Sequence, residues 1–281
     1  MKKLLLFLAF VFFLLAQCQA PYEYKCCNIE MSATTSFALL GLNKGFVKSH
    51  NEPQPSHFQP TLGEKVSFAT PDGRQGQGFL IQATQKTNKY LFVFHEWWGL
   101  NDYIKQESEK LAKDLNVNVL ALDLYDGEVA TKREEAAKLM QSVKPKRAVS
   151  IIQGAIQYVG KRARIATIGW CFGGGWSLQA ALLTKKQAVA CIIYYGMPER
   201  DKKKLKTLQA PVLGIFAGRE KWINAEIVKE FEENLKTLKK QAIIKTFDAE
   251  HAFANPSNPN YHKEYTEQAY QISLEFLRKN L

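Results

Sequence analysis

Several patterns that define common classes of protein are missing from the 281-residue sequence. Its five cysteines form no CxxC pair and no Cys/His zinc spacing, and Cys26 and Cys27 are adjacent, so neither a zinc module nor a disulfide framework is predicted. No internal repeat or low-complexity tract occurs, which argues against a solenoid. The glycine run at 173–175 lacks the spacing G-x-G-x-x-G and a Walker lysine, which argues against nucleotide binding. We therefore expect no metal and no cofactor.

Acidic residues are fewer than basic ones: 27 Asp and Glu stand against 38 Lys and Arg, for a formal net charge of +11. The lysines are scattered, with short runs at 202–204 and 239–240, and no basic stripe is interleaved with aromatic residues. A solvated basic surface is the simplest interpretation, and attraction of anionic substrates is the alternative. We expect no nucleic-acid partner and no membrane contact beyond N-terminal anchoring.

The longest apolar run lies at the N-terminus, where Lys2 and Lys3 precede uninterrupted apolar residues from Leu4 to Ala16. The run is too short to span a bilayer comfortably and is typical of a secretory signal. We predict that residues 1–20 are a signal peptide and that the protein is exported, secreted or periplasmic. Residues 15–18 also resemble a lipoprotein box, although Gln17 fits it poorly. A lipid anchor at Cys18 and an uncleaved signal anchor therefore stay open.

Residues 21–60 form an N-terminal extension of mixed character, and residues 61–281 alternate between strand-like and helix-like segments. Ala188–Tyr195 and Pro211–Ala217 are continuous apolar runs, as expected of strands buried on both faces. This alternation predicts an α/β domain whose mostly parallel sheet has helices on both faces. The expected strands are 66–70, 77–83, 90–95, 117–125, 164–170, 188–195, 211–217 and 242–247, and the helices 102–115, 131–143, 146–161, 172–183, 225–238 and 261–277.

The most informative motif is Gly169-Trp170-Cys171-Phe172-Gly173, at the expected end of one strand and start of the next helix. It has the form of a nucleophile elbow, with Cys in place of Ser, and predicts an α/β-hydrolase fold. Small neighbours are needed because the nucleophile sits on a strained turn. The helix N-terminus favours a thiolate, and the Phe172 N–H would donate to an oxyanion. A structural cysteine beside tight-turn glycines is the alternative.

A base and an acid follow in the chain order of this fold. His251 comes after the last expected strand, and Glu220 lies in the loop after the strand before it. We predict that His251 is the base and that Glu220 orients it, although Glu220 could instead pair with a surface lysine. His95 and His262 are weaker candidates for the base, and His50 and His57 lie in the extension.

The loop after the third expected strand carries another carboxylate, Glu96, followed by Trp97. In an α/β-hydrolase this loop supplies the second oxyanion-hole N–H. Glu96 could perturb the thiol or act as a base, or it could cap the helix that begins near Asp102. Tyr125 ends the neighbouring strand at the same sheet edge, so it is a candidate to line the pocket, with ordinary packing as the alternative.

Together, His95-Glu96-x-x-Gly99, Gly169-x-Cys171-x-Gly173-Gly174 and His251-x-Phe253 resemble the dienelactone hydrolase family. The resemblance runs from about Gly63 to the C-terminus. It implies a Cys171–His251–acid triad and an oxyanion hole made by the Trp97 and Phe172 amides. It also implies that Glu96 takes the thiol proton when substrate binds, so that Cys171 is neutral at rest.

Three positions depart from the family's pattern. Glu220 stands where the triad acid is usually Asp. Arg133 matches one of two arginines that hold a substrate carboxylate, but Asn255 replaces the other and Ala137 replaces a tyrosine. We therefore expect a hydrolase of small ester or lactone carbonyls, with Arg133, Tyr125 and Asn255 near the substrate. The alternatives are a thioesterase or general carboxylesterase on the same triad, or a non-catalytic binding protein of this fold.

Overall fold

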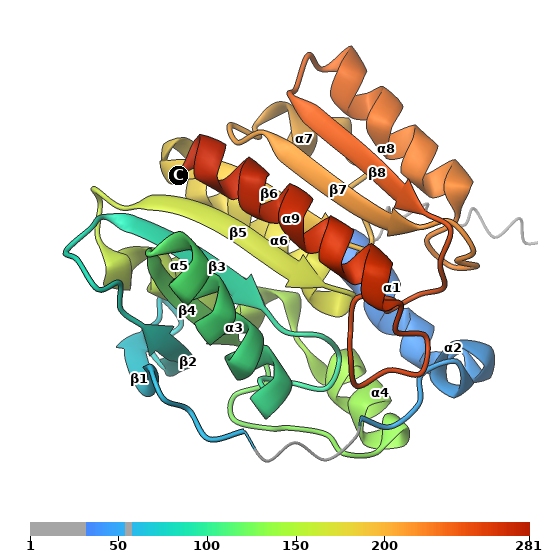
Figure 1. The fold of residues 1–281 in the computed structure, drawn as a ribbon, viewed down its shortest axis with the longest axis horizontal. Helices are drawn as coiled ribbons and strands as arrows, with labels where there is room; N and C mark the ends of the chain where they lie inside the picture. Colours follow the sequence, from blue (N-terminus) through green and yellow to red (C-terminus); the bar gives the residue numbers. More distant parts are fainter. Residues whose placement is uncertain (1–31, 54–57) are drawn as a thin grey trace, which may run out of the picture. The chain divides into compact units, whose positions relative to one another are not determined.

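The computed structural model describes residues 32–53 and 58–281, and its centre is an eight-stranded sheet (Figure 1). The strand order is β1-β2-β4-β3-β5-β6-β7-β8. β2 is antiparallel to both of its neighbours, β1 and β4, and all other neighbouring strands, from β4 through β3 to β8, are parallel. The strands are β1 (Gly63–Ala69), β2 (Gln75–Ile81), β3 (Lys89–Phe94), β4 (Asn118–Asp123), β5 (Arg164–Trp170), β6 (Ala188–Tyr194), β7 (Val212–Ala217) and β8 (Ala242–Phe247).

Helices cover both faces of this sheet. On the near face in Figure 1, α3 and α9 pack against each other and against the strands, while α5 and α6 pack behind the sheet. The helices are α1 (Ala33–Leu39), η1 (Leu40–Leu42), α2 (Lys44–Lys48), α3 (Asp102–Leu115), α4 (Arg133–Ser142), α5 (Pro145–Val159), α6 (Phe172–Thr184), η2 (Lys185–Gln187), α7 (Lys202–Lys206), α8 (Ala225–Thr237) and α9 (Lys263–Asn280).

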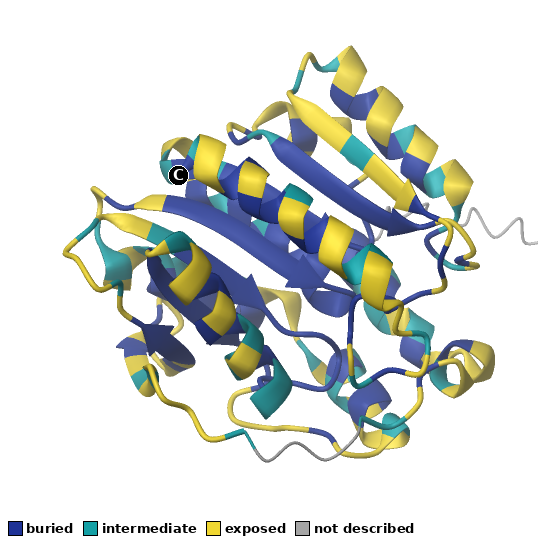
Figure 2. Cartoon of the chain, in the orientation of Figure 1, coloured by how far each residue is buried: buried dark blue, intermediate teal, exposed yellow. Residues whose placement is uncertain are grey.

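The central strands are buried along their length, and exposed positions gather on β1, β8 and the outer helix faces (Figure 2). Every residue of β4 and β7 is buried, as their continuous apolar runs require. The predicted α/β-hydrolase fold, with its mostly parallel sheet, is confirmed. In a parallel sheet the strands end at one edge, so the loops after β3, β5, β7 and β8 meet there.

The N-terminal extension contributes helices that the sequence pattern did not predict. α1 packs against α4 and α6, and α2 packs against α4. Phe37 and Phe46 are their main buried anchors, with 2% and 0% of their surface exposed. Residues 32–50 therefore belong to the core of the domain. The predicted signal peptide and Cys18 lie outside the described residues, and so do residues 54–57 of the expected linker.

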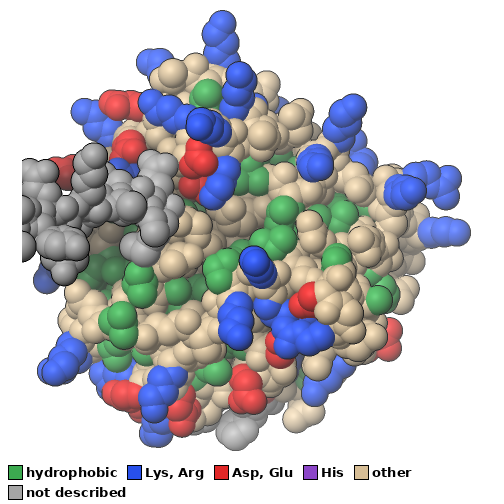
Figure 3. Space-filling model, turned by 180° about the vertical axis from the view of Figure 1, so that it is seen from behind, with side chains coloured by type: hydrophobic (Ala, Val, Ile, Leu, Met, Phe, Trp, Pro, Cys, Tyr) green, Lys and Arg blue, Asp and Glu red, His purple; other side chains and the backbone are tan. Residues whose placement is uncertain are grey.

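Charged side chains are spread over the surface seen in Figure 3, where Lys and Arg alternate with acidic and apolar side chains. Several lysines are paired locally, such as Lys105 with Asp102 and Lys204 with Glu199. Within the part of the chain that the structure describes, no helix is long and apolar enough to cross a membrane.

Candidate active site

Cys171 lies between β5 and α6 on a strained turn. Its φ of 56° and ψ of −120° fall in a region that L residues rarely adopt, at a cost of roughly 1–3 kcal/mol. The turn also requires glycine on either side of it. A Cβ on Gly169 would lie 2.1 Å from the Gly173 carbonyl oxygen, and one on Gly173 would lie 2.3 Å from the Phe94 carbonyl oxygen. The strain and these glycines hold the thiol at the sheet edge, as the elbow motif requires.

The structure brings three of the predicted side chains together from separate loops. The Cys171 Sγ lies 3.2 Å from the His251 Nε2, and the His251 Nδ1 lies 2.7 Å from the Glu220 Oε2. His251 follows β8 and Glu220 follows β7. Cys171, His251 and Glu220 are buried, with 1%, 5% and 7% of their surface exposed. In this arrangement His251 can accept the thiol proton while the carboxylate accepts its Nδ1–H.

Burial and charge set the protonation of this pair. Burial raises the pKa of the Cys171 thiol, and the nearby Glu96 carboxylate raises it further, against the opposing effects of His251 and the Phe172 N–H. Burial lowers the pKa of His251, but Glu220 and Cys171 outweigh that effect and raise the pKa well above its ordinary value. The two shifts act in opposite directions: the raised pKa of Cys171 disfavours the thiolate, whereas the raised pKa of His251 makes the imidazole a stronger acceptor for the thiol proton.

Asp248, a further carboxylate near His251 in sequence, pairs with an arginine instead of the imidazole. It forms a bidentate ion pair with Arg219 at 2.7 and 2.6 Å, on the exposed surface. Glu220 is thus the carboxylate that contacts His251 in this fold, and the alternative that it merely pairs with a surface lysine is wrong in this structure.

Glu96 lies at the same edge and is held by Asn255, whose side-chain N–H donates to the Glu96 Oε2. The other carboxylate oxygen, Oε1, is buried and has no hydrogen-bond partner among the described residues. Burial raises the pKa of Glu96 to about 7, while His251, Asn255 and the Tyr195 hydroxyl each lower it in part. Asn101, rather than Glu96, caps α3, because its side chain accepts from the Ile104 N–H.

The oxyanion-hole candidates are also positioned by the fold. Trp97 follows Glu96 in the loop after β3, and Phe172 is the first residue of α6, with its N–H directed at Cys171. Tyr125 donates its hydroxyl to the Trp97 carbonyl at 3.1 Å. His95 joins the ends of β3 and β4 by contacting the Glu96 carbonyl and accepting from the Leu124 N–H. Tyr125 therefore fixes the Trp97 loop instead of offering a free hydroxyl to substrate.

The carboxylate-binding set expected from the family is incomplete. Arg133 begins α4, and the ion pair it forms within residues 32–53 and 58–281 is with Glu134, at 4.0 Å. Asn255 is occupied by Glu96, and its Oδ1 accepts from the Ser257 N–H and hydroxyl. Ala137 is buried against the core. Asn255 is therefore held at the site by Glu96 and Ser257, through one N–H and the oxygen of its amide, and its contact with substrate stays a prediction.

Two residues at this site were not singled out from the sequence. Tyr195 directly follows β6, and its hydroxyl is buried without a hydrogen bond in the described part of the chain. Its position at the carboxyl end of a central strand was a usable signal. His50 was assigned to the extension, and its only local signal is its spacing of four residues from Phe46, which is one helical turn.

His50 and Phe46 cover the candidate site. The His50 ring lies 5.1 Å from the His251 ring and 4.4 Å from the Trp97 ring, between centroids. Phe46 packs against Trp97 and Trp222 at 5.7 and 5.2 Å. Because these rings help to leave Cys171 1% exposed, a substrate can reach the thiol only after side chains in this cover have moved.

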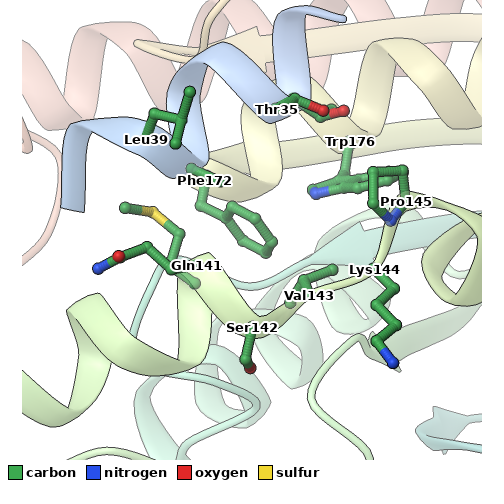
Figure 4. Close-up of a pocket in the computed structure, with 12 residues that line it drawn as sticks. Thr35, Leu39, Gln141, Ser142, Val143, Lys144, Pro145, Phe172 and Trp176 are labelled. Carbon is green, nitrogen blue, oxygen red and sulfur yellow. The ribbon is translucent and has the colours of Figure 1, made fainter. Parts of the chain in front are cut away.

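A cavity of about 440 Å³ opens beside the elbow, on the far side of Phe172 (Figure 4). The Phe172 ring projects into it toward Val143, with Leu39 of α1 above and Trp176 of α6 behind. Its lining is mostly apolar, and Lys144 supplies the cationic side chain at its margin. A small apolar group fits such a space better than a carboxylate does.

The sheet topology and the linked Cys, His and Glu side chains at its carboxyl edge define the molecule as an α/β-hydrolase. The sequence profile of the dienelactone hydrolase family matches residues 77–281, most of the chain. The chain therefore belongs to the dienelactone hydrolase family, as its motifs predicted, and it is a hydrolase of that type.

Related proteins support this assignment. The "Putative carboxymethylenebutenolidase" of Saccharolobus solfataricus is 28% identical over 259 residues, which cover 77% of this chain and 98% of that protein. The carboxymethylenebutenolidase of a Pseudomonas species is 25% identical, over 78% of this chain and 96% of that protein. A dienelactone hydrolase-like promiscuous phosphotriesterase from metagenomic libraries shares the fold, with a TM-score of 0.67 at 19% identity, over 78% of this chain and 99% of that one.

Proposed function

We propose that this protein hydrolyses small, neutral esters or lactones through Cys171 as nucleophile, His251 as base and Glu220 as the acid that orients it. The observation that carries the proposal is the continuous contact from Sγ to Nε2 and from Nδ1 to Oε2, at 3.2 and 2.7 Å. Such a chain is what a thiol nucleophile requires, because the thiolate attacks and a neighbouring base must take its proton.

The reaction follows from this geometry. The thiolate of Cys171 attacks the carbonyl carbon, and the carbonyl oxygen becomes an oxyanion that the Trp97 and Phe172 N–H groups would stabilise. The intermediate collapses to an acyl-thioester, and the leaving oxygen takes a proton from His251. Water then attacks the thioester while His251 accepts its proton, which restores the thiol. In the first step Glu96, with a pKa of about 7, would receive the thiol proton and pass it to His251, which then gives it to the leaving oxygen.

Two observations support neutral substrates. The relatives' name, carboxymethylenebutenolidase, denotes a carboxylated lactone, but Asn255, which stands in place of the family's second arginine, carries no charge and is bound to Glu96, so that Arg133 is the cation left of the expected set. The cavity beside Phe172 is lined mostly by apolar side chains. A carboxylate would therefore find few cationic partners, whereas a short acyl or alkyl group would lie against apolar surface. We further propose, from the charged and apolar N-terminus, that the protein acts outside the cytoplasm.

The test compares two buried cysteines. Cys171→Ala should abolish hydrolysis of p-nitrophenyl acetate, because covalent catalysis cannot proceed without the thiol. Cys191→Ala is the matched control, since the Cys191 Sγ lies 3.8 Å from the Ser177 hydroxyl inside the core and contacts none of the site residues named above. Iodoacetamide should inactivate the wild type in proportion to alkylation of Cys171. Wild-type turnover by Cys171→Ala would end the proposal.

A further inference from the structure

Three buried side chains that can bind metal converge at the candidate site. His50, Cys171 and His251 each offer a ligand atom, and these atoms all lie within 4.8 Å of one another. Cys171 and His251 belong to the proposed reaction, but nothing in that reaction uses His50. His50 is 2% exposed, and its Nε2 has no hydrogen-bond partner among the described residues. A buried nitrogen without a partner has given up its hydrogen bond to water with no replacement, so its position calls for a ligand.

The hydrogen bonds of both histidines leave a lone pair available at the centre of this cluster. The His50 Nδ1 lies 2.8 Å from the Phe46 carbonyl oxygen, which fixes the proton on Nδ1 and the lone pair on Nε2. Glu220 does the same for His251, leaving its Nε2 lone pair toward the Cys171 Sγ. Metal-binding histidines commonly have this support, with one ring nitrogen donating to a carbonyl or carboxylate and the other on the metal.

We propose that His50, Cys171 and His251 form a binding site for a soft divalent cation such as zinc, and that the bound ion blocks the hydrolase. A cysteine thiolate with two imidazoles is a ligand set that zinc accepts, with a fourth position left for water. The group whose ligand atoms lie within 4.8 Å of one another consists of nitrogen and sulfur ligands and does not include the Glu96 carboxylate, so calcium and magnesium, which prefer several oxygen ligands, are disfavoured.

The separations between the three ligand atoms are close to those around a tetrahedral zinc ion. Zinc lies about 2.0–2.1 Å from imidazole nitrogen and about 2.3 Å from thiolate sulfur, so the ligands of one ion are roughly 3–4 Å apart. The Cys171–His251 separation of 3.2 Å is already in this range, and the separations of at most 4.8 Å that involve His50 must shorten by roughly one to two ångströms at most.

Inhibition rests on the proposed function, because the ion would occupy both the nucleophile and its base. Binding replaces the proton of the Cys171 thiol with the metal and releases that proton to solvent. The Cys171 sulfur can then no longer attack a carbonyl, and His251 has no lone pair with which to accept a proton. The extension, through His50, would thus make the hydrolase sensitive to metal.

The experiment titrates the metal-free full-length protein with zinc and, separately, with cobalt(II). Calorimetry should show one zinc per chain with proton release, and cobalt should show the thiolate charge-transfer band and strong visible absorption of a tetrahedral site. Hydrolysis should fall in step with zinc occupancy and recover on chelation. His50→Gln and His50→Ala should each raise the zinc concentration for half-inhibition at least about tenfold, the scale for losing a supporting residue alone.

Each variant is compared with its own metal-free rate, and thermal unfolding checks that it is folded. His262→Gln is the matched control, because that histidine is exposed, stacks on Tyr265 and should leave zinc binding unchanged. The absence of a cobalt–thiolate band in the wild type would overturn the site whatever the variants do. Equal zinc sensitivity in folded His50 variants would overturn the role of His50. Zinc binding with unaffected hydrolysis would overturn the proposed inhibition. Wild-type turnover by Cys171→Ala would refute the proposed function, but it would not contradict the proposal that the wild-type protein binds zinc.

Discussion

The buried carboxylate of Glu96 predicts how the stability of the protein depends on pH. Burial raises the pKa of Glu96 from its ordinary 4.5 to about 7, with partial opposition from His251, Asn255 and Tyr195. The Cys171 thiol and the Tyr103 hydroxyl also face this carboxylate. Replacing Glu96 with Gln keeps the shape and an oxygen that can accept from Asn255, but it removes the group that ionises.

The direction in which stability changes with pH follows from how tightly the folded and unfolded states bind the Glu96 proton. The folded state holds the Glu96 proton more tightly than the unfolded state does, so this contribution to stability is complete below pH 4.5 and is lost as the pH rises through about 7. Each pH unit between the two pKa values corresponds to about 1.4 kcal/mol, so ionised Glu96 costs roughly 3 kcal/mol above pH 7. Relative to the wild type, Glu96→Gln should gain about that much stability between about pH 4.5 and pH 8.

The assay is urea unfolding of both proteins at several pH values, with the free energy of unfolding of the wild type subtracted from that of Glu96→Gln. The subtraction removes the titration of every group that the two proteins share. The difference should be constant at low pH, rise between about pH 4.5 and pH 7, and level off above it. A difference that is flat, or that falls as the pH rises, would refute the interpretation of Glu96 as a buried carboxylate poised near neutrality.

Three further predictions concern the site and the N-terminus. Glu220→Gln should lower kcat on the order of a hundredfold or more, because the tautomer of His251 is then no longer fixed. Arg219→Gln is the control: it removes the exposed ion pair with Asp248 next to Glu220 in sequence, and its kcat should stay near that of the wild type. The kcat/KM ratio for a carboxylated lactone over its methyl ester should remain below roughly a hundred, the limit for one lost charge-assisted bond, and a much larger ratio would mean that a cation holds the carboxylate. N-terminal sequencing of extracytoplasmic protein should give a start beyond Ala16, and recovery of intact Met1 from cytosol would contradict export.

Much of the fold was predictable because its signals are local. The apolar runs of β6 and β7 and the turn between β1 and β2 can be read within a few residues of each strand. The elbow was readable for the same reason, since the strained backbone at Cys171 imposes glycine at fixed positions. Chain order then placed His251 and Glu220 after successive strands, and the parallel sheet brought them to one edge.

The parts of the site that were missed depend on long-range packing. His50 precedes Cys171 by more than a hundred residues, and no spacing rule connects them. Its position depends on Phe46 anchoring α2 against Trp97 and Trp222. The bond between Asn255 and Glu96 was not predicted, because a family comparison shows which residue is replaced but not which partner the new amide finds.

The central claim is that Cys171 forms a covalent acyl intermediate, and its most direct test is to find that intermediate. The protein is mixed with p-nitrophenyl acetate, quenched in acid during turnover, digested and examined by mass spectrometry. The account predicts an acetyl group on the peptide that contains Cys171, and none on the peptide that contains Cys191. Turnover with no acetyl group on Cys171, or with the acetyl group on another residue, would contradict it.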